Sequence, residues 1–360
     1  MITRLLTVCV CFFIFALLRY PAALTEAAAR AFSLWFSSVL PSLFPFLAAI
    51  GILLRMGAAE KLGRLCAPLT KPLFSLSGIC AFPLAAGLLS GYPAGANTVA
   101  QLYEQRRISL SEARKVLLFC NAPGPLFVLG TAGTTFFGSP ALGYTMLLAV
   151  FVGTILTGIS YRSIPTDSNN QMPILPAQKK EPFSLLFSSA VKDALLTSAQ
   201  IGGFLVCFCV LQEGLTQAGF FALLSNALSF LPVSPEFLQA FSGGLLEMTK
   251  GIHGVSLSPD SLRLRASAAV FLLSFGGFSI FGQILGVLRN VPISPFSLLS
   301  AKIRQAFFSV LVFQCFYSIA ETQAQKAVPV FSTHTATAFP TLYGLLSILL
   351  LCSLLLERQK

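Results

Sequence analysis

Two clusters of glycine and proline interrupt otherwise apolar stretches of this chain. The first reads GLLSGYPAGAN over residues 87–97, and the second reads FCNAPGP over residues 119–125. An interrupted helix leaves backbone N–H and C=O groups unpaired, and each such group is costly in hydrocarbon unless protein or water satisfies it. Interruptions at membrane depth are therefore kept mainly where they line a cavity or a binding site. The two clusters predict such a site.

Polar side chains near the interruptions supply the candidate ligand contacts. Glu247 follows the apolar run 241–246, and a carboxylate near the bilayer centre is costly unless it is paired or hydrated. The alternative for Glu247 is a helix end at the membrane interface. Asn97 and Asn121 can instead join helices by hydrogen bonds, and the glycines can serve close packing. The predicted substrate-binding residues are Ser90, Gly91, Tyr92, Gly95, Asn97, Asn121, Gly124, Glu247, Thr249, Ser274, Gly276 and Gly277.

The composition is that of an integral membrane protein. Apolar residues make up 55% of the 360 residues and charged residues only 10%, whereas soluble domains carry about 25% charged residues. Membrane lipid is therefore a predicted partner. The net charge of +11 does not indicate nucleic acid, because the basic residues form short clusters between apolar runs, as in cytoplasmic loops.

No catalytic or metal-binding pattern is visible, and we predict a protein that is not an enzyme. The sequence has no HExxH motif, P-loop or nucleophile elbow, and no pairing of a nucleophile with a base. The nine cysteines form no CxxC motif, and His253 and His334 lie far from paired cysteines. We therefore expect no metal and no cofactor.

The apolar runs divide the chain into five parts. They are a membrane helix (1–30), a first repeat (31–161), a polar linker (162–182), a second repeat (183–320) and a C-terminal membrane helix (321–360). The first run could be a cleaved signal peptide, but we favour an uncleaved helix over residues 1–24. A span over 31–55, kinked at Pro41 and Pro45, precedes an interfacial helix over 56–71. Residues 78–102 then read as a re-entrant hairpin with its tip at 91–93.

The two repeats share one spacing. Gly91 and Gly124 are 33 residues apart, and so are Gly244 and Gly277. Each repeat runs through a broken short element, a polar loop with basic residues (248–265 in the second) and a helix interrupted at its middle. Ser109 and Glu112 in the first loop match a capping box. The order predicts an internal repeat.

Basic residues orient the predicted helices. With residue 1 in the cytoplasm, the basic segments 55–71, 106–115, 162–192, 289–304 and 358–360 all face the cytoplasm. Exceptions to this rule are Arg19, Arg30, Lys250, Arg263 and Arg265. The prediction is an all-α polytopic protein of the inner membrane, with about eight crossings, two re-entrant segments and both termini cytoplasmic. The repeat is inverted, an arrangement that places a site where the broken helices meet.

The motifs SGYPAGA (90–96) and FCNAPGPLF (119–127), with the segment 110–118 between them, resemble the YlbJ-type sporulation integral membrane proteins. The resemblance runs over roughly residues 40–320 and implies a pair of nucleoside-recognition, or Gate, domains. It also implies a multi-pass protein of endospore-forming bacteria needed for spore cortex formation. The Gate domain is similar to parts of nucleoside transporters and of a ferrous-iron permease, which implies solute movement. This chain departs from the family pattern at Ala122 and Pro123, where the family has a small polar residue.

Three functional hypotheses follow. The first is a transporter-like protein that moves or binds a small polar solute or ion at the midplane during sporulation. The second is a scaffold membrane protein of the developing spore, in which the interruptions only permit tight packing. The third and least favoured is an enzyme acting on lipid-linked cell-wall precursors. The sequence does not fix the solute or the oligomeric state.

Overall fold

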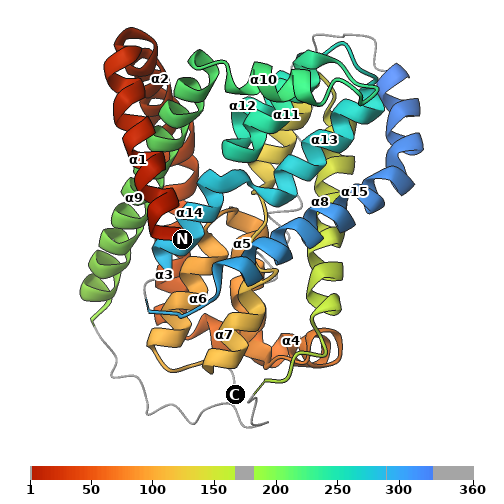
Figure 1. The fold of residues 1–360 in the computed structure, drawn as a ribbon. Coiled ribbons are helices and arrows are strands. Elements are labelled where there is room, and N and C mark those ends of the chain that lie inside the picture. Colours follow the sequence, from red (N-terminus) through yellow and green to blue (C-terminus); the bar gives the residue numbers. More distant parts are fainter. Residues whose placement is uncertain (1, 167–181, 289, 327–360) are drawn as a thin grey trace. The chain divides into compact units, whose positions relative to one another are not determined.

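The computed structural model describes residues 2–166, 182–288 and 290–326. All regular elements in these ranges are helices, which confirms the predicted all-α class. Residues Met1–Glu321 form one compact unit. Most of the predicted linker, most of the predicted C-terminal membrane helix (321–360) and His334 lie outside the described residues. The helices of Figure 1 are α1 (Ile2–Arg19), α2 (Pro21–Leu34), η1 (Trp35–Val39), α3 (Leu40–Arg55), α4 (Ala58–Phe74), η2 (Gly78–Cys80), α5 (Ala81–Ser90), α6 (Ala94–Glu104), α7 (Leu110–Leu117), η3 (Phe127–Phe136), α8 (Pro140–Ser160), α9 (Phe183–Gln217), α10 (Phe220–Ala227), α11 (Pro235–Leu246), α12 (Met248–Leu257), α13 (Leu262–Phe275), α14 (Gly277–Val287) and α15 (Pro295–Lys326).

The N-terminal helices are bent rather than straight. The predicted helix over 1–24 ends at Arg19, and α2 begins at Pro21, at an angle of 109° to α1. Pro21 causes this break because it has no N–H to donate to the preceding turn, whereas it fits the first position of a new helix. The chain then continues through the π-helical segment η1, directly before Pro41, to Arg55. An 84° bend, with Gly57 at a φ of 79°, leads into the predicted interfacial helix, α4.

The first repeat contains the predicted hairpin and the predicted break. Helices α5 and α6 are joined at residues 91–93, where the tip was expected. The capping box of Ser109 and Glu112 starts α7, as predicted. Helix α7 ends at Leu117, residues 121–124 lie outside any helix, and the chain then enters the π-helical η3.

The second repeat has a second hairpin where the sequence indicated a polar loop. Residues 248–257 form helix α12, which packs antiparallel to α11 so closely that Gly244 meets Gly251. The loop prediction was wrong because Met248, Ile252 and Val255 are buried on one helix face, and the charges of Lys250 and the 260–265 segment hid this pattern. Helix α13 is then interrupted at Gly276, one of the two predicted site glycines of this repeat, before α14.

Four helical segments are long and apolar enough to cross a membrane within the described residues. They lie at Pro140–Ser160, Phe183–Gln217, Leu262–Val287 and Pro295–Tyr317, and the count rises to six if each sharply bent pair is one span. The broken segment α7–η3 is too interrupted to pass this test. The structure is thus that of a multi-pass membrane protein, and the total of eight crossings stays a prediction.

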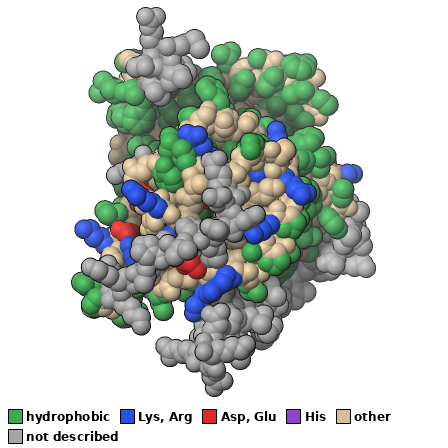
Figure 2. Space-filling view, turned by 90° about the horizontal axis from the view of Figure 1, so that it is seen from below, with side chains coloured by type: hydrophobic (Ala, Val, Ile, Leu, Met, Phe, Trp, Pro, Cys, Tyr) green, Lys and Arg blue, Asp and Glu red, His purple; other side chains and the backbone are tan. Residues whose placement is uncertain are grey.

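The two repeats point in opposite directions. In Figure 1, α5, α6 and α7 occupy the lower half of the drawing and α10 to α13 the upper half. At the lower end, Arg55 pairs with Asp193 at 2.6 Å, and the Arg114 Nε donates to the Pro292 carbonyl at 2.6 Å. The segments with most of the predicted cytoplasmic charges therefore gather at one end, and Figure 2 shows more Lys and Arg than acidic side chains on this face. At the other end, Lys250 Nζ lies 3.3 Å from a Glu213 oxygen.

Candidate functional site

The tip of the first hairpin packs on the break of the helix that follows it. A methyl group placed on Gly91 would lie 2.6 Å from the amide nitrogen of Gly124, and one on Gly124 would lie 2.9 Å from the Ser90 carbonyl oxygen. Gly91 also has a φ of 95°, which L-residues with side chains rarely adopt. Gly87 and Gly95 likewise lie so close to the carbonyl of Cys120 that a methyl group on either would clash with it. The glycines therefore allow the backbone of the hairpin to pack directly against the backbone of the first break.

Asn121 satisfies the end of a half-helix at this contact. Its side-chain oxygen accepts a hydrogen bond from the Ala96 N–H at 3.0 Å, in the first turn of α6, and its Nδ2 donates to the Leu117 carbonyl at 3.4 Å. The residue is 1% exposed. Helix N-termini leave such N–H groups without partners, and Asn121 satisfies one of them. Asn97, one turn into α6, is only half-buried.

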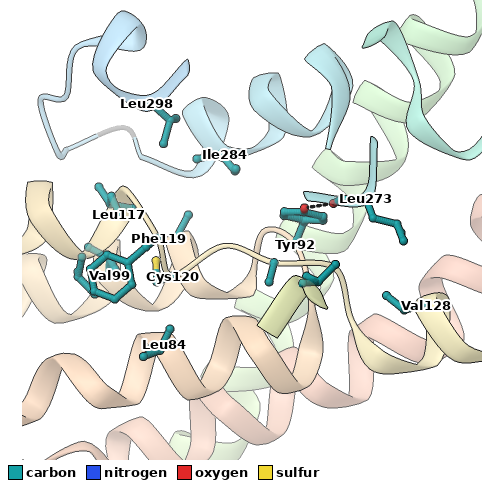
Figure 3. Close-up of a cluster of buried hydrophobic side chains, with 14 of the residues drawn as sticks. Leu84, Tyr92, Val99, Leu117, Phe119, Cys120, Val128, Leu273, Ile284 and Leu298 are labelled. Atoms are coloured by element: carbon teal, nitrogen blue, oxygen red, sulfur yellow. Dashed lines mark hydrogen bonds between the residues drawn. The ribbon is translucent and has the colours of Figure 1, made fainter. Parts of the chain in front are cut away.

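Tyr92 joins the first tip to the second break. Its hydroxyl donates to the Leu273 carbonyl at 2.5 Å and lies 3.3 Å from the Ser274 carbonyl, at the end of α13 (Figure 3). These carbonyls lose their helical partners because Gly276 and Gly277, at φ values of 85° and 75°, end the helix. The first hairpin tip and the second break, 181 residues apart at this bond, are thus in direct contact.

Lys302 is a member of this contact that sequence reasoning missed. We placed it in the cytoplasmic segment 289–304, and this was wrong: it lies within the apolar helix α15 and is 2% exposed. Its ammonium donates to the Asn121 carbonyl at 3.0 Å and to Gln305 Oε1 at 2.7 Å, and it lies 4.8 Å from the centre of the Tyr92 ring. Gln305 in turn donates to Thr154 on α8 at 2.7 Å. The signal was a lysine inside an apolar span, which by default marks function.

Glu247 caps the second half of the second hairpin. Its two oxygens accept from the amides of Thr249 and Lys250, at 3.0 and 2.9 Å, and the side chain is 3% exposed. A carboxylate at a helix N-terminus is favoured by the free N–H groups and by the helix dipole. A methyl group on Gly277 would lie 3.1 Å from the carbonyl oxygens of Gly244 and Leu246. Gly244 and Gly277, paired by spacing in the sequence, are therefore in contact, as Gly91 and Gly124 are.

Buried polar atoms without described partners lie at the second break and on α14 after it. Ser274 is fully buried and its hydroxyl oxygen has no hydrogen-bond partner among the described residues; the same holds for the side-chain oxygen of Gln283, which is 3% exposed. The Gln283 amide nitrogen reaches Ser279 at 3.4 Å. In the first half, the Ser90 hydroxyl is likewise without a partner. Buried polar atoms of this kind are uncommon and call for an explanation.

A turn outside the membrane-spanning segments fixes the base of the second hairpin. The hydroxyl and the amide of Ser234 both donate to the Asp260 carboxylate, at 2.5 and 3.1 Å. Although desolvation acts to raise it, these hydrogen bonds hold the pKa of Asp260 below its usual value. The arms α11 and α12 are therefore anchored at their outer ends as well as capped at the tip.

The structure thus brings most of the predicted residues into two tip-to-break contacts. Ser90, Gly91, Gly95, Asn121 and Gly124 share the first contact, Glu247 and Gly277 belong to the second, and Tyr92, Ser274 and Gly276 lie where the two meet. Thr249 takes part through its backbone only, and Asn97 makes no described side-chain contact. No group of three or more His, Cys, Asp or Glu side chains that could hold a metal occurs in the described ranges.

The fold and the site define a class: an all-helical, multi-pass membrane protein with two opposed hairpin-and-broken-helix units whose interruptions touch. Within that class, the chain belongs to the family of the sporulation integral membrane protein YlbJ of Bacillus subtilis (strain 168). The two share 30% identity over 307 residues, which covers 78% of this chain and 75% of the relative. The Gate family, described as nucleoside recognition, matches residues 36–162.

Two solved structures of CNTnw variants in an outward-facing state are similar in outline. They are 13% identical to this chain, with TM-scores of 0.47 and 0.43. The similarity covers 89% and 88% of this chain, and 85% of each solved chain.

Proposed function

We propose that the protein is transporter-like and binds a small polar solute at the junction of its two interruptions, in the service of sporulation. The observation that carries this proposal is the hydrogen bond from the Tyr92 hydroxyl, at the first hairpin tip, to the Leu273 carbonyl at the second break. Two oppositely directed half-helix systems that meet inside a membrane protein are the arrangement that transporters use to hold a solute near the midplane.

The chemistry of the junction suits an uncharged or weakly charged polar solute. The hydroxyls of Ser90 and Ser274 can donate or accept, the Gln283 oxygen can accept, and none of the three has a partner in the described residues. Hydroxyl and amide groups of a solute would satisfy them. Nucleosides are the first class to test, because they carry such groups and because the matched family is described as nucleoside recognition.

The sidedness follows from the charges. Helices α4 and α7, which carry several basic residues, lie together at the lower end of Figure 1, and cationic loops stay on the cytoplasmic side. The proposal therefore places this end in the cytoplasm of the inner membrane, together with the N-terminus, and gives the protein a part in spore cortex formation, as its family implies. No enzymatic step is included.

Uptake by proteoliposomes tests the proposal. Protein reconstituted into vesicles is presented with a panel of radiolabelled nucleosides and nucleobases, and we expect accumulation of at least one of them above protein-free vesicles. Glu247→Gln and Asn121→Ala should reduce uptake, since each loosens a half-helix end at the junction. If no solute moves, and both variants still support cortex assembly in sporulating cells, the transport function is refuted.

A second candidate function, a scaffold of the developing spore membrane, is favoured by a different observation. At the first break the described contacts are internal: Asn121 accepts from the start of α6, and the backbones of Gly91 and Gly124 pack against each other. Such contacts are expected of a hairpin tip that only stabilises the fold. The scaffold hypothesis predicts that cortex assembly follows protein stability across a set of variants, whereas the transport hypothesis predicts variants that are stable and yet defective.

A further inference from the structure

A groove of about 770 Å³ lies at the basic end of the molecule, away from both interruptions. One wall is the face of α4 that carries Gly63, Arg64 and Lys71, and the other is the segment 162–166 after α8. Residues 75–78, between α4 and η2, line it as well. Gly63 is needed there because a methyl group would lie 2.8 Å from the Ile79 amide nitrogen, so that α4 packs directly on this backbone.

A buried lysine holds the two walls together. The Lys115 ammonium donates to the carbonyls of Ile164 and Arg162, at 2.8 and 2.9 Å, and reaches the Ser75 carbonyl at 3.4 Å; the residue is 1% exposed. The Thr166 hydroxyl also donates to the Ser75 carbonyl, at 3.2 Å. The groove is therefore a built feature with a fixed positive charge beneath it.

Among the described residues, three cations and no acidic side chain line the groove. Arg64, Lys71 and Arg162 are exposed, and their side chains make no hydrogen bond or ion pair with any described residue. The carboxylate of Glu112, beside the lining residue Ser77, is buried and accepts from the amides of Ser77 and Ser109. Three unpaired cations around one concavity attract an anion.

Helix α4 places this groove at the membrane boundary. Leu65, Leu69 and Leu73 form a stripe at spacings of four residues and are 69%, 61% and 36% exposed. Such a stripe beside cationic residues is typical of a helix that lies in the interface, with its leucines in the acyl region and its cations among the headgroups. The groove then opens at the depth of the lipid phosphates.

We propose that this groove binds the phosphate of an anionic phospholipid headgroup, held by Arg64, Lys71 and Arg162. A lipid is favoured over a soluble phosphate because the leucine stripe supplies a surface for its acyl chains next to the cations. Basic pockets at the cytoplasmic side of helical membrane proteins are suited to anionic headgroups. The bound lipid would fix α4 against the segment that follows α8.

Lipid-dependent thermal stability of the full chain tests this proposal. The purified protein in a neutral detergent is heated with added phosphatidylglycerol, phosphatidylcholine or inorganic phosphate at equal phosphate concentration. Of the three additives, we expect only phosphatidylglycerol to raise the unfolding temperature. The lipid concentration at half-saturation should rise roughly fivefold for each cation removed. The triple variant Arg64→Gln, Lys71→Gln, Arg162→Gln should lose the effect, whereas Lys192→Gln, an exposed cation at the start of α9 outside the groove, should keep it.

Other outcomes overturn the proposal. Equal stabilisation by phosphatidylcholine, or by phosphatidylglycerol in the triple variant, would show that the groove does not select the headgroup charge. Stabilisation of the same size by inorganic phosphate would assign the groove to a soluble anion. If the triple variant does not fold, Lys71→Gln is compared with Lys71→Arg, and retention of the charge in the latter should restore the lipid effect. Nucleoside uptake is a separate readout, so failure here leaves the proposed function untouched.

Discussion

At the first interruption the side chains satisfy the groups that the break exposes: Asn121 accepts from the start of α6, and Lys302 donates to the Asn121 carbonyl. At the second interruption Glu247 caps α12 in the same manner, yet the hydroxyl of Ser274 and the oxygen of Gln283 are buried without a described partner. The two breaks share their glycine spacing but differ in how many buried polar atoms lack a described partner: the Ser90 hydroxyl in the first half, and the Ser274 hydroxyl and the Gln283 oxygen in the second. Under the proposed function, the first break would mainly support the junction and the second would mainly receive the polar ligand.

The largest expected effect comes from filling a tip-to-break contact. Gly91→Ala places a methyl group 2.6 Å from the Gly124 nitrogen at a φ of 95°. Overpacking and left-handed strain together should cost about 2–5 kcal/mol and lower the unfolding temperature measured by circular dichroism in detergent. Gly277→Ala, whose new methyl would lie 3.1 Å from two carbonyl oxygens, should destabilise as well but less.

Gly130→Ala is the control, because no atom lies within 4 Å of a methyl group at that position in η3. If Gly91→Ala unfolds at the same temperature as Gly130→Ala, the backbone contact at the first tip does not exist, and the comparison of the two breaks loses its basis.

The second-largest expected effect distinguishes the roles of the two breaks. Asn121→Ala leaves the buried Ala96 N–H without its acceptor and should cost ~1–3 kcal/mol. Ser274→Ala removes a hydroxyl that has no described partner and should change stability by less than ~0.5 kcal/mol while reducing solute uptake. Melting curves and proteoliposome uptake of both variants give the two readouts. Equal destabilisation by both substitutions would contradict the division of roles.

The third effect concerns the cap of the second hairpin. Glu247→Gln keeps an oxygen acceptor for one of the two amides and loses the charge, so the cost should be ~0.5–2 kcal/mol. Glu247→Ala should cost more, because both amides then lose their acceptor. Thermal unfolding compares the pair. A Glu247→Ala variant as stable as the unaltered protein would show that the carboxylate does not cap α12.

The smallest expected effect comes from removing the hydrogen bond between Tyr92 and Leu273, which joins the two halves of the chain. Tyr92→Phe removes the hydroxyl that donates to Leu273 but keeps the ring beneath Lys302, so the cost should be ~0.5–1.5 kcal/mol. Tyr103→Phe on α6, whose side chain has no described hydrogen bond, is the matched control for the melting experiment. If the Tyr92→Phe variant unfolds at the same temperature as the Tyr103→Phe variant, the result contradicts the contact between the first tip and the second break.

The sequence predicted the positions of the breaks because glycine and proline have local backbone consequences. The tip at 91–93, the gap at 121–124 and the break at Gly276 all fall where these residues cluster. The 33-residue spacing also identified the pairs Gly91–Gly124 and Gly244–Gly277, which are in contact. Local chemistry and periodicity are visible in one sequence.

What the sequence could not supply depends on distant contacts or on competing signals. The bond from Tyr92 to Leu273 joins residues from different halves, and no local pattern encodes it. Helix α12 was missed because its charges outweighed a short buried face. Lys302 was assigned to the cytoplasmic segment 289–304 because basic residues near helix ends usually face that side, whereas the packing of α15 against the first break buries it.

An experimental density map of the lipid-reconstituted protein, recorded with a saturating transported nucleoside, tests the site most directly. We predict density for the nucleoside at the second break, within hydrogen-bond distance of the Ser274 hydroxyl and the Gln283 oxygen, with the Asn121 to Ala96 bond intact. Density elsewhere, or a second break in which other side chains satisfy both oxygens and leave no space, would contradict the assignment.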